Sequence, residues 1–454
     1  MNLVLIGMPG SGKTSLGKWV AKRLNILNAD TDQYIEKQTG ITVADLITEN
    51  GESWFREAET HALKKLLVDT YWLGPHIISC GGGIVECEEN RELLKKLGVV
   101  VFVDRPLEDI AVSVRYRADR PLLTDKGALI EMYGRRKPIY EKIADVTVVN
   151  DGPYSEISER ITMLASLRLG VFDFAVIGDP VTQSLSPALH GAVYEMLGMQ
   201  ITYGAIKVAK EDLRLCVSSL RTGALRGLNV TIPHKIDIVH LLDELRGAAL
   251  ESGAVNTVVK DGGRLIGYNT DMEGLRLALE EKGFTYKGGK VVVIGAGGAA
   301  MGVIREAAAH GARQVVVSAR SVKKAESSIS AAMKPSSCDI TIVKGLSAGL
   351  SPHLPDTDIL INATPMGMEG RNEKFEDLSF LKMLPGKALV CDLVYKPMET
   401  ELLKAAKGLG LPFMNGLSML IFQGILAEEI FLDRKIDRGQ CYKALMDILG
   451  GRRR

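Results

Sequence analysis

The chain has 454 residues, which is more than one ordinary hydrophobic core holds and favours two or three domains. About 46% of the residues are hydrophobic and 24% are charged, a composition that argues against disorder and fibrous structure. The charges nearly cancel at a formal +1, so nucleic acid is a poor default partner.

The cysteines and the N-terminus indicate the compartment. The six cysteines are scattered, with no CxxC pair and no histidine spacing that suggests zinc. Met1 leads directly into an apolar strand pattern without a basic leader, and no apolar run reaches about 18 residues. We therefore expect a cytoplasmic protein with reduced thiols, no membrane partner and small molecules as ligands.

Short apolar runs alternate with amphipathic stretches of about 10 to 15 residues, which predicts parallel sheets with crossover helices. The runs are LVLIG, HIISC, VVVFVD, FAVIG, VVVIG, QVVVSA, DILINAT and ALVCDLV. The predicted fold class is α/β.

The first run, Asn2 to Ile6, leads into a loop of the form G-x-x-x-x-G-K-T and then a predicted helix from Leu16 to Leu24. Glycines allow successive backbone N–H groups to surround phosphate oxygens, while Lys13 reaches the terminal phosphates and the Thr14 hydroxyl holds magnesium. This half is predicted to bind a nucleoside triphosphate. The expected contacts are Gly10, Ser11, Gly12, Lys13, Thr14 and Ser15.

Two carboxylates follow in Ala29-Asp30-Thr31-Asp32, just before a predicted helix and at a strand end where open α/β sheets place ligands. One could hold magnesium while the other aligns an attacking hydroxyl. A single Asp-x-Asp is more often a helix cap or a solvated turn, so both interpretations stay open from these residues alone.

Later motifs form an ordered set. They are Phe55-Arg56, Gly81-Gly82-Gly83, Arg120-Pro121-Leu122-Leu123 and a helix start at Arg136-Lys137-Pro138-Ile139-Tyr140. Together with the phosphate loop and the two aspartates, this set resembles shikimate kinase over residues 1–165.

The resemblance implies a complete kinase site. Asp32 would bind the shikimate hydroxyls and act as the base or aligner for the acceptor, and Arg56 and Arg136 would clamp the carboxylate. The glycines Gly81, Gly82 and Gly83 would pack against the ring.

The nucleotide side is also implied by the resemblance. Asp30 and Thr14 would serve magnesium. Arg120 would close over the phosphates and act in catalysis with Lys13, and Arg115 would stack on adenine. Catalysis would consist of positioning and charge neutralisation without a covalent intermediate.

The polar turn Asn150-Asp151-Gly152-Pro153 and a helical stretch from Tyr154 to Leu169 precede a new strand that begins at Phe172. We place the domain break there, after a last helix packed on the first domain. The predicted domains are 1–165 for the kinase, 172–272 completed by 412–454 for substrate binding, and 273–411 for the dinucleotide.

The second half carries G-D-P-x-x-x-S-x-S-P from residue 178, N-V-T-x-P-x-K from residue 229, A-V-N-T from residue 254 and N-T-D from residue 269. This order resembles shikimate dehydrogenase over residues 172–454. The resemblance implies Lys235 and Asp271 as the catalytic pair, with Tyr395 near the substrate carboxylate. The rest of the pocket would be Ser184, Ser186, Thr231, Asn256 and Gln423.

A dinucleotide loop is predicted independently of that resemblance. The strand Lys290 to Ile294 leads into Gly295, Ala296, Gly297, Gly298 and Ala299, where glycines let a pyrophosphate reach a helix N-terminus. The next strand ends in Arg320 and Ser321, with Lys324 following, where an NAD enzyme usually offers an acid. Cations there suit the 2′-phosphate of NADP.

The predicted architecture is a P-loop kinase domain followed by a two-domain dehydrogenase, in which an α/β substrate domain is combined with a Rossmann NADP domain. The sequence therefore predicts that the second half reduces 3-dehydroshikimate with NADPH and that the first half phosphorylates shikimate with ATP and Mg²⁺. One alternative is a kinase joined to a quinate or broader polyol dehydrogenase, which could use NAD. The other is a metabolite sensor built from decayed copies of these domains. Nothing in the sequence fixes the oligomeric state.

Overall fold

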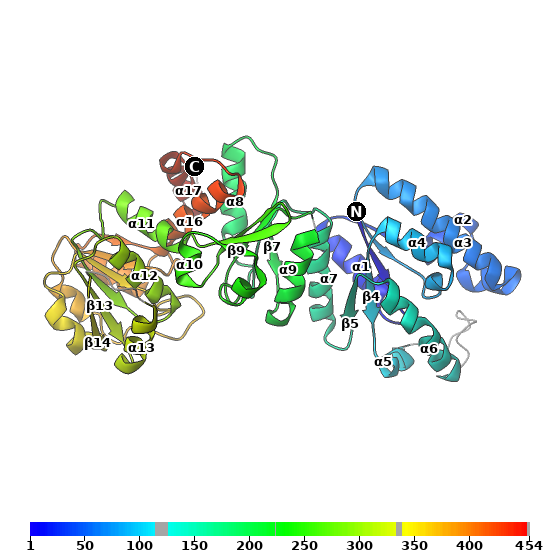
Figure 1. The fold of residues 1–454 in the computed structure, drawn as a ribbon, viewed down its shortest axis with the longest axis horizontal. Coiled ribbons are helices and arrows are strands. Elements are labelled where there is room, and N and C mark those ends of the chain that lie inside the picture. The colour runs from blue at the N-terminus through cyan, green and yellow to red at the C-terminus, as the bar shows by residue number, and fades with distance from the viewer. Residues whose placement is uncertain (114–125, 223, 333–337, 452–454) are drawn as a thin grey trace. The chain divides into compact units, whose positions relative to one another are not determined.

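The computed structural model describes residues 1–113, 126–222, 224–332 and 338–451, and three sheets organise them (Figure 1). The chain divides into two compact units. One contains Met1–Thr182, Gly204–Gly227 and Ile232–His234, and the other contains Gln183–Tyr203, Leu228–Thr231 and Lys235–Arg454. Among the described helices, none is long and apolar enough to cross a membrane.

The first sheet has the strand order β2-β3-β1-β4-β5, and its paired strands all run parallel. Its strands are β1 (Asn2–Ile6), β2 (Leu27–Asp30), β3 (His76–Ser79), β4 (Gly98–Asp104) and β5 (Val146–Val149). The connecting helices are α1 (Lys13–Leu24), α2 (Thr31–Thr39), α3 (Val43–Leu73), the 3-10 helix η1 (Ile84–Glu86), α4 (Glu88–Leu97), α5 (Leu107–Ser113) and α6 (Lys126–Ile143). The α/β class with a parallel sheet is confirmed here.

The expected helix start at Arg136 is wrong. Pro138 lies inside α6, which begins at Lys126. A proline in a helix interior lacks an N–H donor and crowds the carbonyl four residues earlier. That earlier residue is Gly134, and a Cβ on it would meet nothing within 4 Å. The basic residues therefore lie in the second half of a helix that continues through the proline.

The second half of helix α7 (Tyr154–Arg168) has almost no solvent-facing side, because every residue from 161 to 167 is buried, whereas residues 154–156 are exposed. It packs against α1, as expected, and also against the later helix α9 (Leu213–Thr222). Arg160 of α7 pairs with Asp212 at 2.9 Å beside this second contact. The helix is thus enclosed by segments on both sides of it in the sequence.

The second sheet has the order β7-β6-β8-β10-β11-β9. Its strands are β6 (Phe174–Gly178), β7 (Tyr203–Lys207), β8 (Gly227–Val230), β9 (Glu244–Leu245), β10 (Thr257–Asp261) and β11 (Arg264–Tyr268). The helices along this stretch are α8 (Ser186–Met196), η2 (Lys210–Asp212), α9, η3 (Asp237–Leu241), α10 (Ala248–Ser252) and α11 (Asp271–Glu281). The strands β10 and β11 form an antiparallel hairpin, so this sheet is not purely parallel.

The third sheet is parallel throughout, with the order β14-β13-β12-β15-β16-β17. Its strands are β12 (Lys290–Ile294), β13 (Gln314–Ala319), β14 (Asp339–Lys344), β15 (Ile359–Asn362), β16 (Leu389–Asp392) and β17 (Phe413–Met414). The helices are α12 (Gly298–Ala309), α13 (Val322–Ala332), α14 (Ser347–Leu350), η4 (Ser351–His353), η5 (Ser379–Met383), α15 (Glu401–Gly408), α16 (Gly416–Phe431) and α17 (Arg438–Leu449).

Both faces of the third sheet are buried, which explains its continuous apolar strands. Val291 and Val293 belong to one core cluster, whereas Val292 and Ile294 belong to another on the opposite face. The carboxyl ends of parallel strands meet at one edge, so the loops after β12, β13 and β15 lie along the same edge of the sheet.

Candidate functional sites

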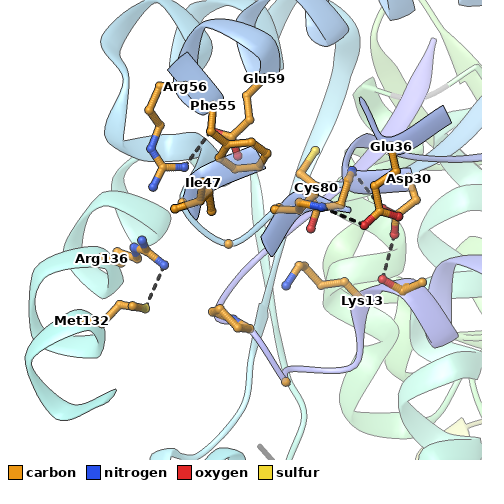
Figure 2. A pocket seen from close by; sticks show the side chains of 18 of the residues that line it. Lys13, Asp30, Glu36, Ile47, Phe55, Arg56, Glu59, Cys80, Met132 and Arg136 are labelled. Atoms are coloured by element: carbon orange, nitrogen blue, oxygen red, sulfur yellow. Dashed lines mark hydrogen bonds and ion pairs between the residues drawn. The ribbon is translucent and has the colours of Figure 1, made fainter. Parts of the chain in front are cut away.

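A cavity of about 430 Å³ lies beside the carboxyl ends of β1, β2 and β3. Figure 2 shows Lys13 and Asp30 on one side of it and Arg56 and Arg136 on the other. The predicted kinase residues that line it are Gly10, Gly12, Lys13, Thr14, Ser15, Asp30, Asp32, Arg56, Gly81, Gly82, Gly83 and Arg136. Ser11 is fully buried within the loop, and Arg115 and Arg120 lie outside the described residues.

Side-chain hydrogen bonds to backbone carbonyl oxygens stabilise the conformation of the phosphate loop. Lys13 Nζ donates to the carbonyl oxygens of Gly7 at 2.9 Å and Met8 at 2.8 Å. Asn150 Nδ2 donates to the carbonyl of Ser11 at 2.8 Å. Gly12, with φ of 91°, directly precedes α1 and provides no side-chain cap. A helix N-terminus without a side-chain cap is the arrangement that phosphate-binding loops use for an anion.

Asp30 caps α2, which is one of the two interpretations left open by the sequence, and its other carboxylate oxygen contacts the phosphate loop. Its Oδ1 accepts from the backbone N–H groups of Asp32 at 3.1 Å and Gln33 at 3.2 Å, which caps α2. Its Oδ2 accepts from the Thr14 hydroxyl at 2.8 Å. The cap therefore fixes the carboxylate so that its second oxygen meets the hydroxyl at the end of the phosphate loop.

Asp32 also lines the cavity, and one of its two carboxylate oxygens has no hydrogen-bond partner. Its Oδ1 is buried without a hydrogen bond. Burial, with the charge of Asp30 adding to it, raises the pKa of Asp32 to about 6. Glu59 lies nearby, and burial raises its pKa to about 7 against the opposing charge of Arg56. The cavity thus holds two carboxyl groups that titrate near neutral pH.

The two arginines are engaged by carboxylates of the protein. Arg56 Nη1 donates to Glu59 Oε2 at 2.7 Å, and Arg136 Nη2 donates to Glu86 Oε2 at 2.8 Å. Arg136 is only 2% exposed. Neither glutamate was predicted from the sequence. Glu59 could have been predicted, because a residue three positions after Arg56 on a helix lies on the same helix face.

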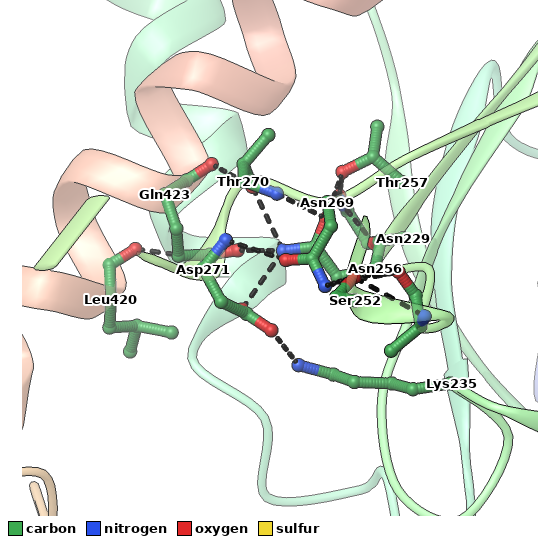
Figure 3. Close-up of polar contacts among 11 residues, drawn as sticks. Asn229, Lys235, Ser252, Asn256, Thr257, Asn269, Thr270, Asp271, Leu420 and Gln423 are labelled. Atoms are coloured by element: carbon green, nitrogen blue, oxygen red, sulfur yellow. Dashed lines mark hydrogen bonds and ion pairs between the residues drawn. The ribbon is translucent and has the colours of Figure 1, made fainter. Parts of the chain in front are cut away.

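The predicted pair Lys235 and Asp271 is in direct contact in the second half (Figure 3). Lys235 Nζ lies 2.6 Å from Asp271 Oδ2, and Asn256 Nδ2 donates to Asp271 Oδ1 at 2.9 Å. Asn256 also reaches Gln423 Oε1 at 3.3 Å. Four of the predicted site residues therefore form one hydrogen-bonded chain from Lys235 to α16.

The other predicted pocket residues lie on loops of the same compact unit. Ser184 Oγ donates to Ser186 Oγ at 3.1 Å at the beginning of α8, so the two hydroxyls are hydrogen-bonded to each other. Thr231 directly follows β8, and the half-buried Tyr395 follows β16. Burial raises the pKa of the Tyr395 phenol, which keeps it a neutral donor at physiological pH.

The glycine loop after β12 has the form expected for dinucleotide binding. Gly295 has φ of +113°, and a Cβ on it would lie 2.8 Å from Thr364 Cγ2. A Cβ on Gly297 or Gly298 would meet nothing within 4 Å, so open space lies in front of the α12 N-terminus. The loop packs closely against its neighbour and leaves room for a bound group where the helix begins.

The predicted cations follow the next strand. Arg320, Ser321 and Lys324 are exposed at the end of β13 and the beginning of α13. Asn362, the last residue of β15, is fully buried and donates to Asp392 Oδ1 at 2.9 Å. Its own Oδ1 accepts from the backbone N–H of Thr364 at 3.1 Å, so it supports the loop that faces the glycines.

This fold and these two sites define an α/β enzyme with a phosphate-loop kinase site and a separate dinucleotide-dependent dehydrogenase site. Three family models match in the same order along the chain. They are Shikimate kinase over residues 9–165, the Shikimate dehydrogenase substrate binding domain over residues 176–258, and Shikimate / quinate 5-dehydrogenase over residues 276–375.

The chain belongs to the shikimate dehydrogenase family and carries a shikimate kinase domain ahead of the dehydrogenase. The NADP⁺ shikimate dehydrogenase of Symbiobacterium thermophilum is 39% identical over 263 residues, which is 57% of this chain and 88% of the relative. Both resemblances found in the sequence, and the bifunctional enzyme of the shikimate pathway that they implied, are confirmed.

Solved structures agree with this assignment. A shikimate dehydrogenase in complex with NADP⁺ is similar with a TM-score of 0.53 and 36% identity, over 60% of this chain and 94% of that one. The shikimate 5-dehydrogenase of Listeria monocytogenes, in complex with shikimate and NAD, has a TM-score of 0.54 and 32% identity, over 61% and 98%.

Proposed function

We propose that the dehydrogenase half reduces 3-dehydroshikimate to shikimate with NADPH and that the kinase half then transfers the γ-phosphoryl group of ATP to shikimate. The hydroxyl that the first reaction produces is the one that the second phosphorylates. The single observation that carries this proposal is the direct contact of Lys235 with Asp271, in a chain that also gathers the kinase residues around one cavity.

In the kinase site, Asp32 is proposed to accept the proton of the attacking hydroxyl. Its pKa of about 6 leaves most of the carboxylate ionised at pH 7 yet basic enough to take a proton. The α1 N-terminus and Lys13 would neutralise the phosphates, and Arg120, which lies outside the described residues, would contribute a further charge as the family resemblance implies. Arg56 and Arg136 would bind the carboxylate of the acid.

The proposed magnesium ligands fit the ion. The Thr14 hydroxyl and Asp30 Oδ2, which lie 2.8 Å apart, are hard oxygen donors of the type that Mg²⁺ prefers. A P-loop site takes its remaining ligands from phosphates and water, so few protein oxygens are needed. Mg²⁺ bound there would supply charge neutralisation to the phosphate oxygens.

In the dehydrogenase site, Lys235 is proposed to donate the proton to the carbonyl oxygen as hydride arrives at the carbon. Asp271 orients the ammonium group, and Asn256 fixes Asp271 by holding its other oxygen. The ammonium also stabilises the negative charge that develops on that oxygen. The hydroxyls of Ser184 and Ser186 and the phenol of Tyr395 would bind the acid.

The glycine loop from Gly295 to Ala299 is proposed to hold the pyrophosphate, and NADP(H) is the proposed dinucleotide. The adenosine end would meet Arg320, Ser321 and Lys324, because exposed cations and a hydroxyl suit a 2′-phosphate. The NAD complex of the Listeria monocytogenes relative keeps the second candidate open, a dehydrogenase that also uses NADH.

The test is a set of assays on the full chain. NADPH and NADH are each paired with 3-dehydroshikimate and 3-dehydroquinate, and shikimate phosphorylation is followed with ATP with and without Mg²⁺. We expect NADPH with 3-dehydroshikimate to have the highest kcat/KM, and phosphorylation to require Mg²⁺. A preference for NADH would overturn the dinucleotide assignment, and a preference for 3-dehydroquinate would overturn the substrate assignment.

A further inference from the structure

Glu86 occupies the two arginines that are proposed to bind the substrate carboxylate. It is the last residue of η1, which follows the Gly81-Gly82-Gly83 turn directly. Its Oε2 lies 2.8 Å from Arg136 Nη2 and 3.1 Å from Arg56 Nη2. One carboxylate oxygen of the protein therefore contacts a terminal nitrogen of both arginines.

The other terminal nitrogens of these arginines are engaged as well. Arg136 Nη1 contacts Met132 Sδ at 2.9 Å, and Arg56 Nη1 donates to Glu59 Oε2 at 2.7 Å. Arg56 Nη2 also donates to Glu52 Oε1 at 2.6 Å, and Arg136 Nε is buried without a hydrogen bond. A carboxylate oxygen that reaches both guanidinium groups at once would therefore take the position between the two Nη2 atoms, which Glu86 Oε2 occupies. Substrate and Glu86 carry the same functional group, so binding of one excludes the other from these atoms.

Glu86 has a third arginine partner, to which it can remain bound when it releases the other two. Its Oε1 lies 2.8 Å from Arg135 Nε, and the Arg135 side chain is 56% exposed, whereas that of Arg136 is 2% exposed. Burial alone would raise the pKa of Glu86, but the hydrogen bond of Arg136 and the charges of Arg136, Arg135 and Arg56 hold it below its usual range. Glu86 is therefore an anion that keeps a cationic partner when it leaves the other two.

The free enzyme also needs such an anion. A guanidinium group as buried as that of Arg136 is strongly destabilising without a counter-ion. Glu86 supplies the counter-ion until a substrate carboxylate replaces it.

We propose that Glu86 is a displaceable counter-ion that competes with the carboxylate of the acid substrate for Arg56 and Arg136, and so sets the KM of the kinase for that acid. This inference rests on the proposed function, which assigns the two arginines to the carboxylate. Binding exchanges one carboxylate for another, and Glu86 stays on Arg135.

The first test is Glu86→Gln, which keeps the shape and removes the charge. If Glu86 holds the arginines for about four-fifths of the time, its removal lowers the KM for shikimate about fivefold. The kcat stays within about twofold, because the phosphoryl-transfer groups are untouched. Kinase assays with saturating ATP and no dinucleotide report this site alone. A KM that rises or does not change overturns the proposal.

Two controls separate displacement from a general gain in positive charge. Glu88→Gln makes the same charge change two residues away, on a side chain that is 88% exposed, and should leave the KM unchanged. The methyl ester of shikimate lacks the competing carboxylate, so Glu86→Gln should not lower its KM. A fall of similar size in either control would overturn the displacement mechanism.

Arg135→Gln tests the same inference in the opposite direction. Without its outer partner, Glu86 should stay on Arg56 and Arg136 more of the time, and the KM for shikimate should rise. In the Glu86→Gln background the same substitution should have no effect, which a double-mutant cycle measures. An equal rise in both backgrounds would mean that Arg135 acts on the substrate directly, and would contradict the proposal. If Glu86→Gln fails to fold, Arg135→Gln alone still decides, because a KM for shikimate that falls or does not change would contradict the proposal.

A wrong assignment of Arg56 and Arg136 to the substrate carboxylate would give a different pattern of KM values. Arg136→Lys should raise the KM for shikimate at least tenfold, because a bidentate guanidinium contact is lost. If it does not, the arginines do not bind the carboxylate, whatever Glu86→Gln does. If it does, and Glu86→Gln leaves the KM unchanged, only the role of Glu86 is refuted.

Discussion

The unpaired oxygens of Asp32 and Glu59 both face the α-carbon of Gly81. A Cβ built there would lie 2.5 Å from Asp32 Oδ1 and 3.1 Å from Glu59 Oε1, and both oxygens are buried without a hydrogen bond. The turn therefore needs glycine at this position, since a side chain would collide with the proposed base. Two buried carboxyl groups with raised pKa values give the kinase site a definite response to pH.

Kinase activity should fall steeply as the pH is lowered through about 6. Asp32 must be ionised to accept a proton, and its pKa is raised to about 6. The kcat/KM for shikimate should lose about tenfold per pH unit below that value. ADP release measured from pH 5 to 8.5 tests this, with reductase activity of the same sample as the control for unfolding. A kinase profile that is flat down to pH 5 would refute the assignment of Asp32.

Asp32→Asn should abolish phosphorylation and stabilise the kinase region at high pH. A carboxyl whose folded pKa is raised stabilises the fold below its unfolded pKa and loses that contribution as pH rises through the folded value. At pH 8 the ionised side chain should therefore destabilise the wild type by about 1–3 kcal/mol.

The melting temperature of Asp32→Asn should exceed that of the wild type at pH 8, and the difference should shrink towards pH 4. A difference that does not depend on pH would mean that the raised pKa is not its cause.

Gly83→Ala should raise the KM for shikimate. A Cβ on Gly83 would collide with both terminal nitrogens of Arg56, so the guanidinium group must move. A displacement of about 1 Å in a positioning group can lower the rate about 100-fold, and we expect at least a tenfold rise in KM. Gly134→Ala is the matched control, because a Cβ there meets nothing within 4 Å and should leave the kinetics unchanged.

Lys235→Ala should lower the reductase kcat by about 100- to 10,000-fold, the usual contribution of a general acid. Kinase activity of the same preparation should remain nearly intact, because the kinase cavity contains no residue of this network. Asn256→Ala should have a smaller effect, since it frees Asp271 without removing the proton donor. Parallel loss of both activities in Lys235→Ala would point to unfolding and not to catalysis.

Arg320→Ala should weaken the use of NADPH and leave the use of NADH unchanged. The guanidinium group is exposed at the end of β13, so its removal leaves the fold intact. Loss of one charge-assisted contact should lower kcat/KM for NADPH about tenfold or more. Steady-state kinetics with both dinucleotides measure the ratio. If kcat/KM falls equally with NADPH and with NADH, Arg320 contacts a part of the molecule that the two dinucleotides share.

The features that could be predicted from the sequence are those that local residues determine. The phosphate loop has its glycines, lysine and hydroxyl within eight residues, directly after a buried strand. The pairing of Lys235 with Asp271 followed from the ordered motifs, although the residues are 36 positions apart.

The features that were missed depend on tertiary packing. Glu86 meets Arg136 across 50 residues, and nothing local marks it as a partner. Proline is over-represented at the first position of a helix, so the motif around Pro138 suggested a start. In the structure Pro138 instead lies inside α6. The contact of α7 with α9 likewise joins segments that no pattern connects.

Helix α7 also decides where the chain can be cut. Its residues from 161 to 167 are buried on every side, between α1 and α9. If the kinase fragment ends before α7, it loses the helix that covers α1 and exposes apolar surface. If the kinase fragment keeps α7, the dehydrogenase fragment loses the helix that covers α9. A kinase or a dehydrogenase expressed alone would therefore need substitutions on whichever face of this helix it exposes. Separating the two activities as independent proteins is a problem of redesigning one helix, not of choosing a linker.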